Sequence, residues 1–210
     1  MKKYILLDWD GNLAKTLDVW LRVLRTVFEK RGIHLTDEEI ASSFGAFNQY
    51  AKAWGVQDVD VAAEEADALA KQKLPDVELY PDALEVLAAL HVSDRKLALI
   101  TTSPHRNVQH LLEKYDITRY FDIIIAGDDV QNHKPHPEPL EKALEKLGGN
   151  KSEAIMIGDS DKDLGAAQNA GIDSILFYPP EHKKFYNLEQ LQKLNPTHVI
   201  TDFRQVLEIV

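Results

Sequence analysis

Near the start of the chain, the apolar residues form one continuous run. Residues 4–7 read Tyr-Ile-Leu-Leu, and a short continuous apolar run is typical of a parallel strand buried on both faces. From Leu17 to Phe28 the apolar residues recur every three or four positions, and Gly32 ends the pattern. This spacing predicts an amphipathic helix directly after the first strand.

The following part of the chain carries helical signals and no credible strand. Residues 36–39 read Thr-Asp-Glu-Glu, a capping-box pattern that predicts a short helix ending near Gly45. Two more helices are expected over 49–54 and 59–73, the second because it is rich in Ala, Glu and Lys. Residues 16–79 are therefore predicted to form a small helical bundle.

From Tyr80 onward, apolar runs of strand length alternate with helical patterns. Further strands are predicted at 96–101, 121–126, 154–158, 174–177 and 198–200. Helices are predicted at 81–90, with Pro81 in the first turn, and at 107–115, 139–147, 161–170, 188–194 and 203–209. Alternation of this kind implies a parallel sheet that is covered by helices on both faces.

We therefore expect an α/β fold, a doubly wound and Rossmann-like parallel sheet with a small all-helical cap inserted after the first strand. The core would comprise residues 1–15 and 80–210, and the cap residues 16–79. Because ligands of open α/β sheets bind at the carboxyl ends of the strands, a cap inserted at this point is expected to lie over the ligand-binding edge.

Composition and charge narrow the classes of partner. The 210 residues are 44% hydrophobic, which is enough for a proper core. The net charge of −10 disfavours nucleic acid and anionic membranes as partners, since both attract basic surfaces. The chain has no cysteine and no apolar run of membrane-spanning length. We expect a cytoplasmic protein, monomeric or homodimeric, without a nucleic-acid or membrane partner.

Polar side chains follow the predicted strands where each strand ends. Asp8 and Asp10 follow the first strand, and Thr101 and Thr102 follow the second. In a doubly wound sheet, the loops at these positions gather at one edge. We therefore expect six side chains to converge there: Asp8, Asp10, Thr101, Lys134, Asp159 and Asp163.

Such a set of groups suits phosphoryl chemistry. Carboxylates from different strands are hard oxygen ligands for Mg²⁺, and the ion offsets their charge. One carboxylate can attack phosphorus, and a second can protonate the leaving oxygen and later activate water. A hydroxyl and an ammonium group can hold the phosphoryl oxygens.

Taken one at a time, these residues also have simpler interpretations. The first two aspartates can form an acidic turn in which Gly11 adopts a positive φ. Lys134 alone can be a solvated surface lysine, and Asp159 with Asp163 can cap a helix. The joint occurrence of all these residues at strand ends favours the catalytic interpretation.

Two further groups are less specific. Loop histidines are usually solvated, although three of them flank the expected site and can contact a substrate: His105, His133 and His136. Four aromatic residues of the helical segment are expected to form its own small core rather than a substrate cage: Phe44, Phe47, Tyr50 and Trp54.

The motifs together resemble those of the haloacid dehalogenase superfamily of phosphatases. Residues 8–11, Asp-Trp-Asp-Gly, resemble its nucleophile motif. Thr101, the pair Lys134-Pro135, and residues 158–163 match its second, third and fourth motifs in order. The helical segment resembles the small helical cap of the phosphoglycolate phosphatase-like and β-phosphoglucomutase-like members, so the resemblance covers essentially the whole chain.

The resemblance implies roles for individual residues. Asp8 would be the nucleophile and a metal ligand. Asp10 would be the general acid and base, and its backbone carbonyl would also bind the metal. Asp159 would be a further metal ligand.

The same resemblance implies a phosphoryl-binding set made of Thr101, Thr102, Lys134 and Gly11. Asp163 would support the metal shell or orient Lys134.

The resemblance implies a Mg²⁺-dependent phosphatase that hydrolyses a small phosphorylated metabolite through a phospho-aspartate. The alternative is a mutase of the β-phosphoglucomutase type. A non-enzymatic binding module and a dehalogenase are disfavoured because neither needs Asp10. Asn12 stands where the family usually has threonine, and because its amide can donate a hydrogen bond, we expect the turn to survive.

Overall fold

A fully parallel six-stranded sheet is the centre of the computed structural model, which describes residues 2–210. The strand order is β3-β2-β1-β4-β5-β6. The strands are β1 (Tyr4–Leu7), β2 (Lys96–Ile100), β3 (Ile123–Ile125), β4 (Ala154–Gly158), β5 (Asp173–Phe177) and β6 (His198–Ile200). The predicted α/β fold with a doubly wound parallel sheet is confirmed.

Helices cover both faces of the sheet. Since successive residues of a strand point to opposite sides, the residues of β1 are divided between two hydrophobic clusters. Ile5 and Leu7 of β1 belong to one hydrophobic cluster with residues of α5, α6 and α10. Tyr4 and Leu6 belong to a second cluster with residues of α7 and α8. The helices of the sheet part are α5 (Ala83–His91), α6 (His105–Lys114), α7 (Glu138–Leu147), α8 (Asp161–Ala170), α9 (Leu188–Gln192) and α10 (Val206–Ile209).

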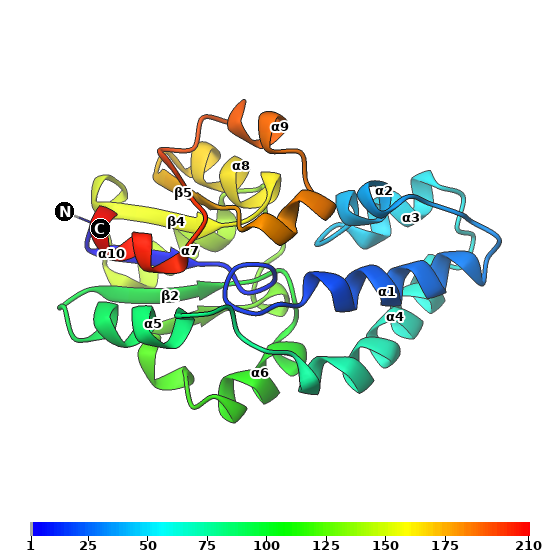
Figure 1. Cartoon of the computed structure of the whole chain (residues 1–210), viewed down its shortest axis with the longest axis horizontal. Coiled ribbons are helices and arrows are strands. Elements are labelled where there is room, and N and C mark those ends of the chain that lie inside the picture. Colours follow the sequence, from blue (N-terminus) through cyan, green and yellow to red (C-terminus); the bar gives the residue numbers. More distant parts are fainter. Residues whose placement is uncertain (1) are drawn as a thin grey trace.

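Between β1 and β2 the chain forms a helical insert, the name used here for residues 16–79. Within that described range no strand occurs. Its helices are α1 (Leu17–Glu29), α2 (Asp37–Ser42), α3 (Phe47–Ala53) and α4 (Val59–Lys73). Figure 1 shows the insert beyond one end of the sheet, at the end opposite the two termini.

The two chain segments that lead into and out of the insert lie side by side. Lys15 N donates to Glu78 O at 2.9 Å, and Tyr80 N donates to Leu13 O at 2.9 Å. These hydrogen bonds hold the two connections between the sheet part and the helical insert next to each other. The division into a core of residues 1–15 and 80–210 and a cap of residues 16–79 stays a prediction.

Some element ends differ from the sequence prediction. The helix expected from Pro81 begins only at Ala83, because Asp82 has a left-handed backbone with φ of 65°. The strand expected at 121–126 covers only Ile123–Ile125, an edge strand that pairs with β2 alone. Smaller shifts affect α3, α6, α7 and α9, and the last helix is divided into a 3₁₀ turn (Phe203–Gln205) and α10.

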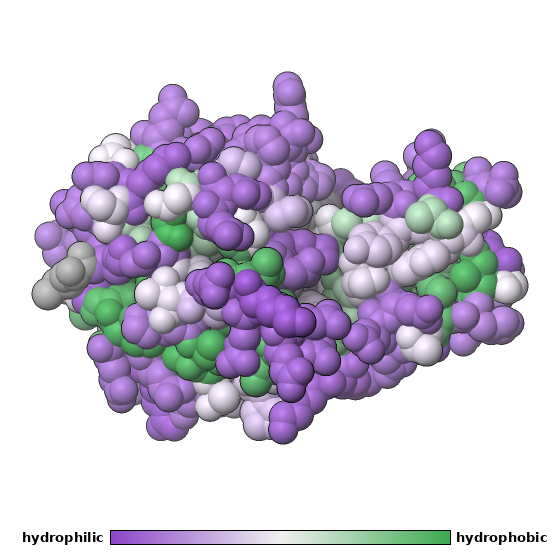
Figure 2. All heavy atoms as spheres, turned by 90° about the horizontal axis from the view of Figure 1, so that it is seen from above, coloured by the Kyte–Doolittle hydropathy of each residue, from purple (hydrophilic) through white to green (hydrophobic). Residues whose placement is uncertain are grey.

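The outer surface is largely hydrophilic on the face drawn in Figure 2. Its outline is notched between the larger lobe and the smaller lobe that carries the helical insert. None of the helices in the part of the chain from residue 2 onward has the length and apolar character to cross a membrane. The cytoplasmic location and the monomeric or homodimeric state stay predictions.

Candidate active site

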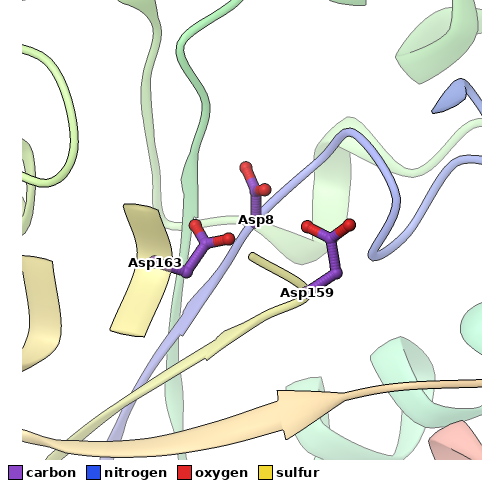
Figure 3. A group of neighbouring side chains, drawn as sticks. All are labelled: Asp8, Asp159 and Asp163. Carbon is purple, nitrogen blue, oxygen red and sulfur yellow. The ribbon is translucent and has the colours of Figure 1, made fainter. Parts of the chain in front are cut away.

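Three buried carboxylates meet at the carboxyl ends of the central strands. Asp8 directly follows β1, Asp159 directly follows β4, and Asp163 lies in the first turn of α8. One oxygen from each of them lies within 4.8 Å of the others. Figure 3 shows the three carboxyl groups gathered beyond the ends of these two strands. The convergence expected from the sequence is present for these side chains.

Lys134 lies between two of these carboxylates. Its Nζ is 2.7 Å from Asp8 Oδ1 and 2.6 Å from Asp163 Oδ1, and it donates to Ile100 O at 3.1 Å. Only 3% of the Lys134 side chain is exposed. Its burial therefore rules out the simpler interpretation of a solvated surface lysine.

Both carboxylate oxygens of Asp163 are occupied by donors. Oδ1 accepts from Lys134, and Oδ2 accepts from Ser160 Oγ at 2.6 Å and from Ser160 N at 3.2 Å. The bonds from Ser160 form the capping box at the start of α8. Of the two roles expected for Asp163, the contact present is the one that orients Lys134.

The donor set fits a divalent cation. Asp159 is 1% exposed, and its Oδ2 has no hydrogen-bond partner within residues 2–210. Three buried carboxylates face a single ammonium group, and such an excess of buried charge is costly unless it is neutralised. A Cβ at Gly11 would collide with the Asp159 carboxylate, so only glycine leaves this oxygen its space.

The pKa values of Asp8, Asp159 and Lys134 reflect the same excess of buried negative charge. Burial, together with the nearby Asp163 carboxylate, raises the pKa of Asp8 to about 8, although Lys134 acts in the opposite direction. Burial likewise raises the pKa of Asp159 well above its usual range. Burial alone would lower the pKa of Lys134, but the two carboxylates more than offset this and raise it. A bound divalent cation would shift both carboxyl pKa values downward.

Asp10 lies apart from the buried cluster and is half-buried. Its Oδ2 accepts from Ser103 Oγ at 2.8 Å, and its Oδ1 accepts from Trp20 Nε1 at 2.9 Å. Because Asp10 lines the same cavity as Asp8, it is available to a group bound there.

The turn after β1 forms with Asn12 in it, and the side-chain amide of Asn12 takes part in its hydrogen bonding. Asn12 Nδ2 donates to Asp8 O at 3.0 Å, as expected for an amide in this position. Gly11 has φ of 76°. Thr102 lines the cavity, whereas Thr101 is buried and its Oγ1 accepts from Ser103 N at 3.0 Å. The phosphoryl-binding roles of these residues stay predictions.

A cavity of about 570 Å³ lies between the strand ends and the helical insert. Of the three loop histidines, His133 lines it. His105 instead contacts Asp129 at 2.8 Å, and His136 accepts a hydrogen bond from Glu138 N.

The aromatic residues of the insert are divided between two roles. Phe44 and Phe47 line the cavity. Both also pack against the hydrophobic core, where Phe47 lies on Phe28 of the insert with centroids 5.6 Å apart, so their core role does not exclude contact with a bound group. Trp54 packs on Phe28, with centroids 5.4 Å apart, and on Tyr50, with centroids 5.2 Å apart. Tyr50 and Trp54 thus match the expected core role.

Sequence reasoning missed several residues around the site. Trp20 appeared only as an apolar position of α1, although its ring nitrogen reaches Asp10. His182 is fully buried in the turn Pro180–Lys184, with its Nε2 2.7 Å from Tyr80 Oη and its Nδ1 3.9 Å from Asp159 Oδ2. Burial lowers the pKa of His182 to about 3, so the ring is neutral. Only Ser160 had a local signal, the capping box.

Part of the chain is similar in sequence to two curated phosphate-releasing enzymes. A phosphoglycolate phosphatase of Salmonella typhi is 42% identical over 125 residues, which are 59% of this chain and 47% of that protein. The pyrophosphatase PpaX of Halalkalibacterium halodurans is 35% identical over 134 residues, 64% of this chain and 60% of that protein. The chain thus spans about half the length of the curated relatives it matches.

A solved structure and a family sequence pattern also match this chain. The crystal structure of a candidate haloacid dehalogenase-like hydrolase from Bacteroides fragilis superimposes with a TM-score of 0.87 at 26% identity, covering 98% of this chain and 100% of that one. The sequence pattern of the haloacid dehalogenase-like hydrolases matches residues 5–177. This range includes every side chain of the cluster and Lys134, and the chain therefore belongs to the haloacid dehalogenase-like hydrolase family.

Proposed function

We propose that this chain is a Mg²⁺-dependent phosphatase that hydrolyses a small phosphomonoester through a phospho-aspartate on Asp8. The observation that carries the proposal is the arrangement of Lys134 between Asp8 and Asp163, beside the unpartnered oxygen of Asp159. Asp8, Lys134 and Asp159 line a cavity that Asp10 lines as well.

In the first step, a carboxylate oxygen of Asp8 forms a bond to phosphorus and the bond from phosphorus to the ester oxygen breaks. The ester oxygen takes a proton from the protonated Asp10 carboxyl and leaves as an alcohol. Lys134, which already contacts Asp8, would hold a phosphoryl oxygen during the transfer.

In the second step, the Asp10 carboxylate takes a proton from a water molecule whose oxygen attacks phosphorus. The bond between phosphorus and Asp8 breaks, which releases inorganic phosphate. Asp8 is then free and Asp10 is protonated again, so one water is consumed and both residues return to their starting states.

Asp8, Asp159 and the backbone carbonyl of Asp10 would hold the metal, with Asp163 as support. When bound, Mg²⁺ would neutralise the charge of the carboxylates and of the phosphoryl group and thereby lower the barrier to their approach. Carboxylate and carbonyl oxygens are the ligands that Mg²⁺ prefers.

A small substrate is supported by the site and by the relatives. The cavity of about 570 Å³ lies in the range of small-molecule sites. The relatives are named phosphoglycolate phosphatase and pyrophosphatase, and both names specify small phosphorylated compounds. We therefore propose a small phosphorylated metabolite as the substrate.

The experiment is a phosphate-release assay over a panel of small phosphate esters with Mg²⁺. Asp8→Asn should abolish release, because an amide is a far poorer nucleophile, while the fold persists. Asp116→Asn is the matched control, since this aspartate is exposed and is not among the residues that line the cavity. Undiminished turnover by Asp8→Asn, or isomerisation of a sugar phosphate without phosphate release, would overturn the proposal.

A further inference from the structure

Both oxygens of the Asp10 carboxylate accept hydrogen bonds, and the two donors come from separate parts of the fold. Ser103 Oγ donates from the loop after β2, at 2.8 Å. Trp20 Nε1 donates from α1, the first helix of the insert, at 2.9 Å. All three side chains line the cavity. The orientation of this carboxylate therefore depends on one hydrogen bond from the sheet part and one from the insert.

The two donors differ in chemistry. An indole N–H can only donate, whereas a serine hydroxyl can donate or accept. The Trp20 bond therefore holds Oδ1 as an acceptor in either protonation state of Asp10. A proton carried by Asp10 accordingly sits on Oδ2, which can then donate a hydrogen bond to the turned Ser103 hydroxyl or pass the proton to the leaving oxygen of the substrate.

Orientation of this carboxyl matters because proton transfer needs hydrogen-bond reach to the leaving oxygen. A small misplacement of a catalytic group can cost orders of magnitude in rate. The Asp10 side chain has two rotatable bonds, and one donor on each oxygen restrains both of them. Loss of one donor would leave the carboxyl group free to turn.

We propose that Trp20 is a positioning residue for Asp10: its indole N–H, together with Ser103, aims the carboxyl group at the leaving-group oxygen. Because Trp20 belongs to the insert, Asp10 is held in this orientation only while α1 lies against the turn after β1. This inference rests on the proposed phosphatase function, in which Asp10 protonates the leaving group.

The test compares two substrates that need different amounts of protonation. An alkoxide must be protonated as it leaves, so glycerol 1-phosphate needs the acid, whereas p-nitrophenolate leaves p-nitrophenyl phosphate without much help. The quantity measured is kcat/KM, which covers the steps up to departure of the leaving group. Trp20→Phe keeps the aromatic packing and removes the N–H. It should lower kcat/KM for the alkyl ester at least about tenfold more than for the aryl ester.

Matched variants separate positioning from general damage. Trp54→Phe changes a tryptophan of the same insert that packs on Phe28 and lies outside the cavity lining, and it should leave the alkyl-to-aryl ratio unchanged. Trp20→His restores a ring N–H and should recover part of the ratio. Ser103→Ala removes the other donor and should lower the ratio as well, so the inference stays testable if Trp20→Phe folds poorly.

Asp10→Asn tells the two possible failures apart. This variant should show a strong bias against the alkyl ester. If it does and Trp20→Phe and Ser103→Ala do not, the positioning role of Trp20 is wrong and the proposed function stands. If Asp10→Asn shows no bias, the acid role fails and the inference fails with it.

Discussion

At the scale of single residues, the ammonium group of Lys134 holds the site together. It contacts Asp8 and Asp163 at 2.7 and 2.6 Å and is almost fully buried. A buried ion pair is weak evidence for net stability, because desolvation offsets the attraction, but removing one partner leaves an uncompensated charge. Lys134 is thus important to the fold as well as to the proposed chemistry.

Lys134→Met should lower the free energy of unfolding by about 3–5 kcal/mol, because it strands two buried carboxylates. Urea unfolding in metal-free buffer measures this change. Lys151→Met is the control, since Lys151 forms an exposed ion pair with Glu141 and its loss should cost less than about 1 kcal/mol. Equal effects of the two substitutions would contradict the role of Lys134 in charge balance.

At the scale of elements, the insert is fastened to the sheet part by α4 and α6. Asp67 of α4 accepts from Arg106 at 2.6 Å and from Asn107 at 2.9 Å. Burial raises the pKa of Asp67, but the hydrogen bonds from Asn107 and Arg106 outweigh it, so the net pKa lies below the usual 3.8. This contact therefore favours the ionised side chain.

A lowered carboxyl pKa stabilises the fold above the unfolded-state value, and the contribution is lost as the pH falls through the folded-state value. At pH 7, Asp67→Asn should be less stable than wild type by about 1 kcal/mol. The difference in unfolding free energy between wild type and Asp67→Asn should disappear as the pH falls below 3.8. Urea unfolding across this range measures it. Asp76→Asn, at an exposed aspartate, is the control, and a gap independent of pH would refute the account.

At the scale of the whole molecule, the site exists only where three structural parts meet. The ends of β1 and β4 supply Asp8 and Asp159, α8 supplies Asp163, and the insert closes the cavity above them. An ion that binds this assembly cannot bind the unfolded chain in the same way. Its binding energy is therefore added to the stability of the fold.

Mg²⁺ should raise the melting temperature, and a chelator should reverse the effect. At a concentration 100 times the dissociation constant, the gain is about 2.7 kcal/mol, or roughly 5–10 °C for a chain of this size. Calorimetry measures the shift. Asp159→Asn should remove most of it and Asp116→Asn none, and an unchanged melting temperature in the wild type would argue against a Mg²⁺ site.

Residues with a strong local pattern were predicted well. The apolar run before Asp8 and the run before Asp159 set both strand ends, and parallel strands bring such ends to one edge. Helix ends were less accurate, as at α5, where the left-handed backbone of Asp82 delays the start. A single-residue backbone state of this kind has no periodic signal.

The sequence alone determined the parallel sheet, the helical character of the insert and the meeting of Asp8, Asp159, Asp163 and Lys134, since chain order and periodicity carry that information. Only the tertiary structure decided that Trp20 reaches Asp10 and that Phe44 faces the cavity. These contacts depend on how the insert sits over the strand ends. Packing between distant segments sets that placement, and local patterns do not encode it.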